Sequence, residues 1–79
     1  MNLVTNKMFF ASRVKELREE KGMLQKDLAD VLGISRGFLS QIEIGGRYPS
    51  YDILVAIANF FDCSTDYLLG RVDDFGNRV

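Results

Sequence analysis

Two short apolar runs separated by a glycine occupy residues 25–43, with the sequence QKDLADVLGISRGFLSQIE. Apolar residues recur at helical spacing in both runs, as Leu28, Ala29 and Leu32 in the first and as Leu39 and Ile42 in the second. Gly33 interrupts the pattern between them. We therefore expect two short helices, over about 25–32 and 36–44, joined by a tight turn.

The second of these helices is expected to have a small and polar outer face. Ser35 precedes it and can cap it, because a serine hydroxyl accepts a hydrogen bond from a backbone N–H of the first helical turn. Once the apolar residues point inward, the positions left on the outside are Arg36, Gly37, Ser40, Gln41 and Ile44. Such a face can lie in a nucleic-acid groove, from which an acidic face would be repelled by phosphate.

The stretch from about Arg13 to Leu69 resembles the phage-repressor-like (Cro/C1, or XRE) family of helix-turn-helix transcriptional regulators. The motifs that carry the resemblance are RVKELREEKG, Gln25 at the start of a helix, GIS at the turn, LSQIE, GGRYPS and the closing DYLL. None of these motifs is specific alone, but their order and spacing together are. The resemblance implies an all-α fold, a compact five-helix bundle of the lambda-repressor-like DNA-binding type. Its helices 2 and 3 would form the helix-turn-helix.

The chain divides into three segments. Residues 1–8 lack periodicity and are expected to be a flexible leader, residues 9–70 the helix-turn-helix DNA-binding domain, and residues 71–79 a C-terminal tail. Within the domain, further helices are expected from about residue 9 or 10 to 21, from 51 to 61 after a Ser50 cap, and briefly after Ser64. Both glycines of the pair Gly45 and Gly46 are expected to have the positive φ that ends the third helix.

Composition limits the chemistry that this chain can carry. Seventy-nine residues form one small domain, and the chain has no histidine and a single cysteine, Cys63. We therefore expect no metal site, no cofactor, no disulfide within the chain and no small-molecule ligand. The N-terminal apolar pieces are broken by Asn6 and Lys7, so we expect neither a secretory signal nor a membrane span. The expected location is the cytoplasm, and the resemblance suggests a bacterial, phage or mobile-element origin.

The charge is unevenly distributed along the chain. The net charge is −1, but residues 1–49 carry eight basic residues against six acidic ones, whereas residues 50–79 carry two against five. This asymmetry is consistent with one face that meets a polyanion, and it is equally consistent with an ordinary solvated surface.

The resemblance also implies an ion pair inside the domain. Arg18 falls close to the inward stripe of the first helix, where a charge is costly unless it has a partner. In similar proteins an arginine at this position pairs with a glutamate at the end of the third helix, which is Glu43 here. The alternative is that the two are unrelated surface charges.

The expected DNA contacts lie on the second and third helices and on the loop after them: Gln25, Lys26, Ser35, Arg36, Gly37, Ser40, Gln41 and Arg47. Arg36 can bind guanine or phosphate, and Gln41 can pair with adenine. Gln25 and Lys26 stand in a first helical turn, where the backbone favours phosphate, and Gln25 is also a candidate brace for the third helix. Gly37 departs from the family pattern, which usually has a polar residue there.

Surplus apolar residues mark the acidic C-terminal part, and we expect them to form a homodimer contact: Val55, Phe60, Tyr67, Leu69, Val72 and Phe75. The competing explanation is that the tail folds back over this surface within one chain.

The function that these features favour is sequence-specific binding of double-stranded DNA by a small transcriptional regulator, most simply a repressor, with the third helix in the major groove. No nucleophile and base pair, carboxylate dyad or phosphate loop can be assembled, so we expect no enzyme activity. The alternative is a protein-interaction module, such as an antirepressor, an antitoxin-like partner or an adaptor, that keeps the fold without specific DNA readout. A regulatory protein partner is compatible with either function.

Overall fold

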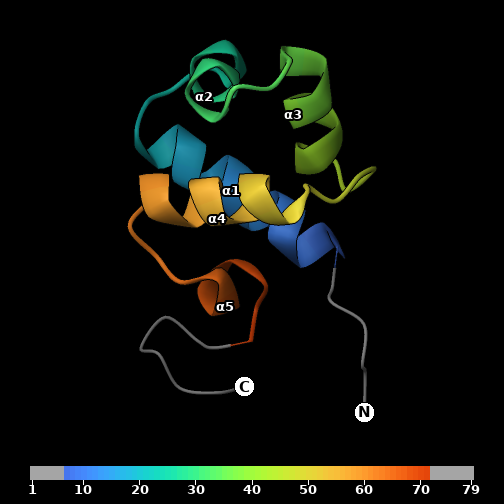
Figure 1. Ribbon diagram of the computed structural model, residues 1–79, viewed down its shortest axis with the longest axis vertical. Helices are drawn as coiled ribbons and strands as arrows, with labels where there is room; N and C mark the ends of the chain where they lie inside the picture. The colour runs from blue at the N-terminus through green and yellow to red at the C-terminus, as the bar shows by residue number, and fades with distance from the viewer. Residues whose placement is uncertain (1–6, 72–79) are drawn as a thin grey trace.

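A computed structural model describes residues 7–71, which form five α-helices and no strand (Figure 1). The helices are α1 (Lys7–Glu20), α2 (Gln25–Leu32), α3 (Arg36–Glu43), α4 (Tyr51–Phe60) and α5 (Thr65–Leu68). The expected all-α architecture with five helices is therefore confirmed.

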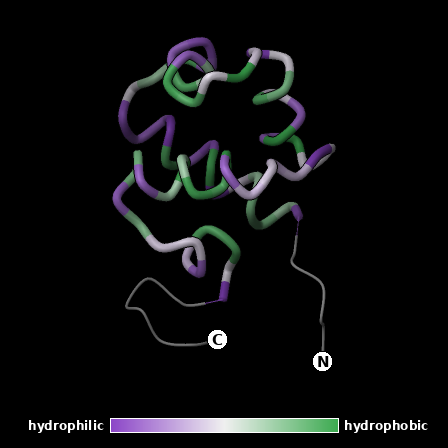
Figure 2. Tube along the Cα trace, viewed as in Figure 1, coloured by the Kyte–Doolittle hydropathy of each residue, from purple (hydrophilic) through white to green (hydrophobic). Residues whose placement is uncertain are grey.

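The α2–α3 pair and α5 lie at opposite ends of the molecule, with α1 and α4 between them (Figure 1). Helix α1 contacts α3 toward one end and α5 toward the other, while α2 packs against both α3 and α4. The outer turns of α2 are hydrophilic and its inward side is hydrophobic (Figure 2). Helix α1 is thus the support to which the α2–α3 pair is attached.

The core is built by apolar side chains from all five helices. The largest of those with less than 2% of their surface exposed are Phe10, Val14, Leu28, Leu39, Ile42, Ile57 and Leu68. Full burial of one such side chain contributes about 1.5–3 kcal/mol. Because Leu39 and Ile42 supply two of these seven, the outer face of α3 is left to the polar residues of that helix.

Three helices begin with a serine cap, as the sequence predicts for each. The hydroxyl oxygens of Ser35, Ser50 and Ser64 accept hydrogen bonds from the backbone N–H three residues later, at 3.0, 3.3 and 3.0 Å. Helix α2 differs, because Leu24 at its N-cap position has no side-chain acceptor. Only the reverse bond is present there, from the backbone N–H of Leu24 to the carboxylate of Asp27 at 3.0 Å.

Two expectations about local structure need correction. Helix α1 begins at Lys7, so Lys7 and Met8, which we assigned to the leader, are helical. The Met8 sulfur occupies the space that a Cβ on Gly45 would need, a tertiary contact that periodicity does not reveal. The expectation of a positive φ is met at Gly45, at 79°, and is wrong for Gly46. The rest of the leader, and the tail from residue 72 on, lie outside the described residues.

Between residues 7 and 71, no helix is both long enough and apolar enough to cross a membrane. The same residues contain no group of three or more His, Cys, Asp or Glu placed to hold a metal ion.

Candidate nucleic-acid interface

The turn between α2 and α3 is closed by backbone hydrogen bonds around a left-handed glycine. Gly33 has φ 70°, and its N–H donates to the carbonyl of Asp30 at 3.2 Å. The next N–H, of Ile34, donates to the carbonyl of Ala29 at 3.0 Å. These bonds satisfy the last carbonyls of α2, so the chain turns sharply and α3 starts after only three residues.

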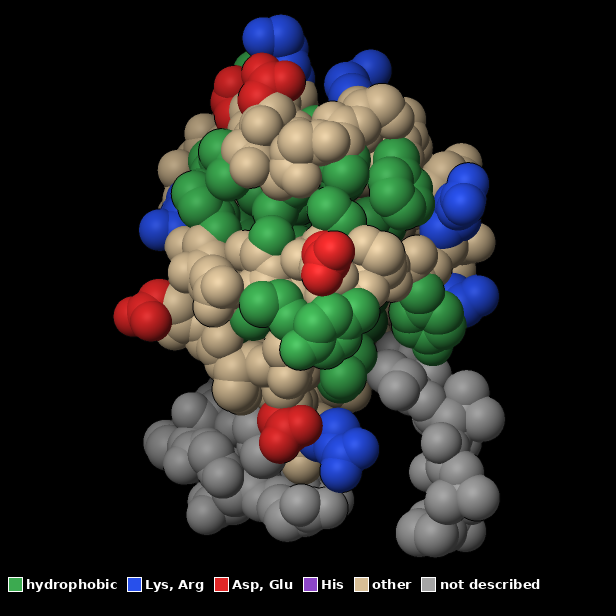
Figure 3. Space-filling model, in the orientation of Figure 1, with side chains coloured by type: hydrophobic (Ala, Val, Ile, Leu, Met, Phe, Trp, Pro, Cys, Tyr) green, Lys and Arg blue, Asp and Glu red, His purple; other side chains and the backbone are tan. Residues whose placement is uncertain are grey.

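The outer face of α3 is polar and accessible. Arg36, Gly37 and Gln41 are exposed and Ser40 is half-buried, while Ile44, just past the end of the helix, is 61% exposed. Lys and Arg side chains project at the α2–α3 end of the molecule and along the edge beside α3 (Figure 3). The structure therefore brings the expected contacts of the third helix together on one open surface.

Arg18 of α1 and Glu43 of α3 form the predicted contact. The Nε of Arg18 donates to Oε2 of Glu43 at 2.8 Å, and its Nη2 donates to Oε1 at 3.0 Å. Only 10% of the Arg18 side chain and 1% of the Glu43 side chain are exposed. Hydrogen bonding to Glu43 raises the pKa of Arg18, and burial opposes this rise. The Arg18 guanidinium therefore keeps its positive charge in the buried pair.

The same carboxylate also holds α2. The side-chain Nε2 of Gln25 donates to Oε1 of Glu43 at 3.1 Å, and Arg18 Nη1 donates to the carbonyl of Met23, before α2, at 2.7 Å. Gln25 thus braces α3 from the first turn of α2. Three helices meet at one buried, fully satisfied polar cluster, which fixes the orientation of α3.

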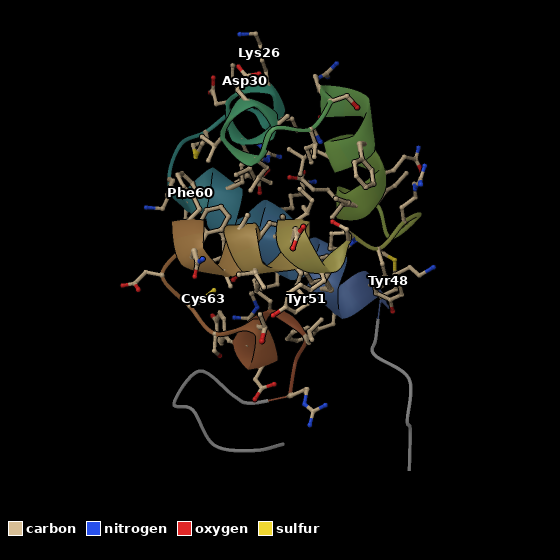
Figure 4. All side chains as sticks on the ribbon, viewed as in Figure 1. Lys26, Asp30, Tyr48, Tyr51, Phe60 and Cys63 are labelled. Carbon is tan, nitrogen blue, oxygen red and sulfur yellow. The ribbon has the colours of Figure 1, made fainter. Side chains whose placement is uncertain are left out.

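Lys26, the other candidate in the first turn of α2, points away from the body of the molecule beside Asp30 (Figure 4). Their charged atoms are 3.8 Å apart, and the side chains are 74% and 71% exposed. A pair this exposed is weak, so Lys26 can exchange Asp30 for a phosphate at little cost.

The loop after α3 is held by contacts between cations and aromatic rings. The Arg47 guanidinium lies 5.1 Å from the ring centroid of Phe38, and the Lys7 ammonium lies 5.0 Å from that of Tyr48. Such contacts contribute about 0.5–1 kcal/mol at exposed sites. The sequence singled out Arg47 but missed Lys7, because only the fold shows that the first turn of α1 reaches this loop.

The expected dimer residues do not all share one surface. Val55 and Phe60 are five residues apart, which places them about 140° apart around α4 at 100° per residue. Figure 4 shows Phe60 on the α2 side of α4 and Tyr51 on the side toward α5. Phe60 also contacts Phe61 edge to face, with ring centroids 5.0 Å apart. Phe60 and Val55 thus lie on different sides of α4, and their expected role in a dimer contact stays a prediction.

The remaining apolar candidates belong to α4, to α5 and to the residue directly after α5. Figure 3 shows hydrophobic side chains gathered over this part of the molecule. Val55, Tyr67 and Leu69 are half-buried, and Tyr67 is covered by the Arg13 guanidinium 3.9 Å from its ring centroid. Tyr51, four residues before Val55, is 79% exposed and was missed by the sequence analysis. Val72 and Phe75 lie outside the described residues.

Comparison with known proteins gives a consistent result. Residues 14–68 match the family model described as helix-turn-helix. An uncharacterized HTH-type transcriptional regulator of Bacillus subtilis, YqaE, is 42% identical over 60 residues, which are 76% of this chain and 52% of that protein. The chain spans about half the length of the curated relatives that it matches first.

Two solved structures that contain DNA are similar in fold. The P22 c2 repressor in complex with a synthetic operator superposes with a TM-score of 0.74 and 30% identity over 77% of this chain and 92% of that chain. SinR, a biofilm master regulator from Bacillus subtilis, in complex with DNA superposes with a TM-score of 0.69 and 33% identity over 76% and 97%.

Proposed function

Because the chain belongs to the helix-turn-helix family whose model its residues 14–68 match, we propose that it binds double-stranded DNA sequence-specifically and regulates transcription, most simply as a repressor. The observation that carries the proposal is the support of α3. Glu43 anchors this helix to α1 and α2 from the inside, and its outer face is left polar and open. Solved relatives of the same fold are bound to DNA.

In this proposal α3 lies in the major groove, where Arg36, Ser40 and Gln41 face base edges. Ser35 and Gly37 at the start of α3 allow the backbone to approach closely. Phosphate contacts come from three surrounding cations, Lys26, Arg47 and, as an addition from the structure, Lys7. The first turn of α2, which contains Gln25, also faces a phosphate. These contacts fix the orientation of the protein on DNA, whereas the α3 side chains determine sequence preference.

The proposal includes no enzyme activity, cofactor or small-molecule ligand, and it places the protein in the cytoplasm with its DNA. Selection of bound sites from random duplex DNA, followed by affinity measurements across salt concentrations, tests the function. We expect one enriched sequence and an affinity that falls steeply with salt. No enriched sequence and no salt-dependent association would favour a protein-interaction module instead.

We further propose that the protein acts as a homodimer through the α4 and α5 side, with Val55, Tyr67 and Leu69 joined by Tyr51. One small module contacts few base pairs, so two half-sites about 34 Å apart would increase specificity. Tyr51→Glu should shift the protein from dimer to monomer in sedimentation equilibrium and leave the fold intact, since this side chain is 79% exposed. Val31→Glu on α2, where Val31 is 52% exposed, is the matched control and should leave the dimer unchanged. A wild-type protein that is monomeric at micromolar concentration, alone and on DNA, would contradict dimerisation.

A further inference from the structure

Gly46, the second glycine of the loop after α3, is not required by the backbone conformation. Its φ lies outside the left-handed region, unlike that of its neighbour Gly45 at 79°. Residues with a Cβ adopt such a backbone without strain. The feature that distinguishes this position is instead the space beside the glycine.

The space that a Cβ on Gly46 would fill is occupied by Gln41. Such an atom would overlap Oε1 of the Gln41 carboxamide, and it would lie 3.6 Å from Cδ and 3.5 Å from the backbone carbonyl oxygen of the same residue. Gln41 thus folds its side chain back over the loop instead of extending away from α3. Gly46 is what leaves room for this position.

The loop cannot withdraw easily to make more room. The carbonyl oxygen of Gln41 accepts hydrogen bonds from the N–H of Gly46 at 2.8 Å and from the N–H of Arg47 at 3.3 Å. Moving residue 46 away would weaken both bonds. The Gln41 side chain is exposed and flexible, so it is the group that would yield to an added methyl group.

We propose that Gly46 is a positioning residue for sequence recognition, which acts by setting where the Gln41 carboxamide meets the base edges. This inference rests on the DNA-binding function proposed above. Alanine at position 46 would push the carboxamide off the loop and outward along α3. The base preference that depends on Gln41 would change, while the phosphate contacts and the fold would remain.

The position of the carboxamide can be tested in the free protein by nuclear magnetic resonance. We expect nuclear Overhauser contacts between the Gln41 side chain and the Gly46 α-protons, and a shift of the Gln41 side-chain amide signals in Gly46→Ala. Gly37→Ala is the control, since a Cβ there meets only the Ser35 Oγ, at 4.0 Å. Absence of the Gln41–Gly46 contacts in the wild-type protein would overturn the inference without reference to DNA.

The effect on recognition is tested by site selection with the wild type, Gly46→Ala, Gln41→Ala and the double variant. Gly46→Ala should alter preference at the base pair affected by Gln41→Ala, by about fivefold or more, the lower range for one bidentate side-chain contact. In a protein that already carries Gln41→Ala, Gly46→Ala should not change the base preference further. In a protein that carries Ser40→Ala, it should change the preference as much as in the wild type. The double variant also relieves the overlap, so it remains testable even if Gly46→Ala alone unfolds.

The outcomes separate the two proposals. If the wild type selects a site and Gly46→Ala selects the same one, the role of Gly46 is refuted and the DNA-binding function stands. If the wild type selects no site, the DNA-binding function itself fails, and the recognition role of Gly46 fails with it.

Discussion

The guanidinium of Arg18 and the carboxylate of Glu43, 25 residues apart in the chain, share two hydrogen bonds at the junction of α1 and α3. A third bond to the same carboxylate comes from Gln25 on α2. Within the described residues no buried side-chain nitrogen or oxygen lacks a hydrogen-bond partner. Removal of one member would therefore leave the others charged or polar, buried and unsatisfied.

Arg18→Met should lower the free energy of unfolding by about 3–5 kcal/mol, because the Glu43 carboxylate would lose its counter-charge while remaining buried. Urea unfolding of the wild type and the variant measures this difference. Lys26→Met is the matched control, since it breaks an ion pair that is more than 70% exposed, and it should cost less than about 1 kcal/mol. Equal losses in the two variants would show that the buried pair does not hold α1 to α3.

Leu24→Ser should stabilise the protein by about 0.5–1 kcal/mol. Leu24 has the extended backbone of an N-cap residue, with φ −77° and ψ 160°, but it has no side-chain acceptor for the N–H groups in the first turn of α2. Serine would complete the reciprocal pair that Asp27 already half forms. Ser35→Ala tests the same physics with the opposite sign, because it removes an existing cap and should cost about 1 kcal/mol. A thermal midpoint that rises in the first variant and falls in the second supports the prediction.

Arg36→Ala and Lys26→Ala should weaken DNA binding in different ways. Arg36 lies on the outer face of α3, so its loss should reduce affinity for the selected site more than for random DNA. Lys26→Ala should reduce both affinities about equally and lower the slope of log K against log salt by about one unit. Titrations of both variants at several salt concentrations measure these quantities. Identical behaviour would refute the division between base contacts and phosphate contacts.

Cys63 should react slowly with iodoacetamide in the folded protein. Burial raises the pKa of its thiol, and the positive charge of Arg13 offsets part of the rise. At a pH just above the ordinary thiol pKa of about 8.5, the folded chain therefore keeps more of its Cys63 protons than the unfolded chain. The free energy of unfolding falls as pH rises through this range. The rate of Cys63 alkylation at that pH, followed by mass spectrometry with and without denaturant, measures the predicted protection. Equal rates in the two conditions would contradict it.

Sequence reasoning predicted the helices well because local signals specify them. Serine caps and helical spacing mark the starts of α3, α4 and α5, and α2 was placed correctly from its apolar period and the glycine that follows. The start of α1 was placed two or three residues late. Lys7 and Met8 contribute nothing to the apolar stripe, and their contacts with Tyr48 and Gly45 depend on how the chain returns after α3.

The candidate site was predictable only in part, because it also depends on contacts between residues far apart in the sequence. The Arg18–Glu43 contact followed from a resemblance in position, whereas periodicity alone placed Arg18 merely near an inward stripe. The fit of Gln41 against Gly46 has no counterpart in the sequence, where two adjacent glycines suggest a flexible turn. Its detection required the coordinates of both residues, because a steric reason for glycine becomes visible only beside the group that fills the space.

The buried cluster around Glu43 has a consequence for engineering. The buried side chains of α3 are Leu39, Ile42 and Glu43 on its inner side, and neither Arg36 nor Ser40 contributes a side chain to the buried ion-pair cluster. The outer residues of this helix can therefore be exchanged to retarget the protein while the scaffold stays constant. Positions 41 and 46 are the exception, and a library that varies them should vary them together.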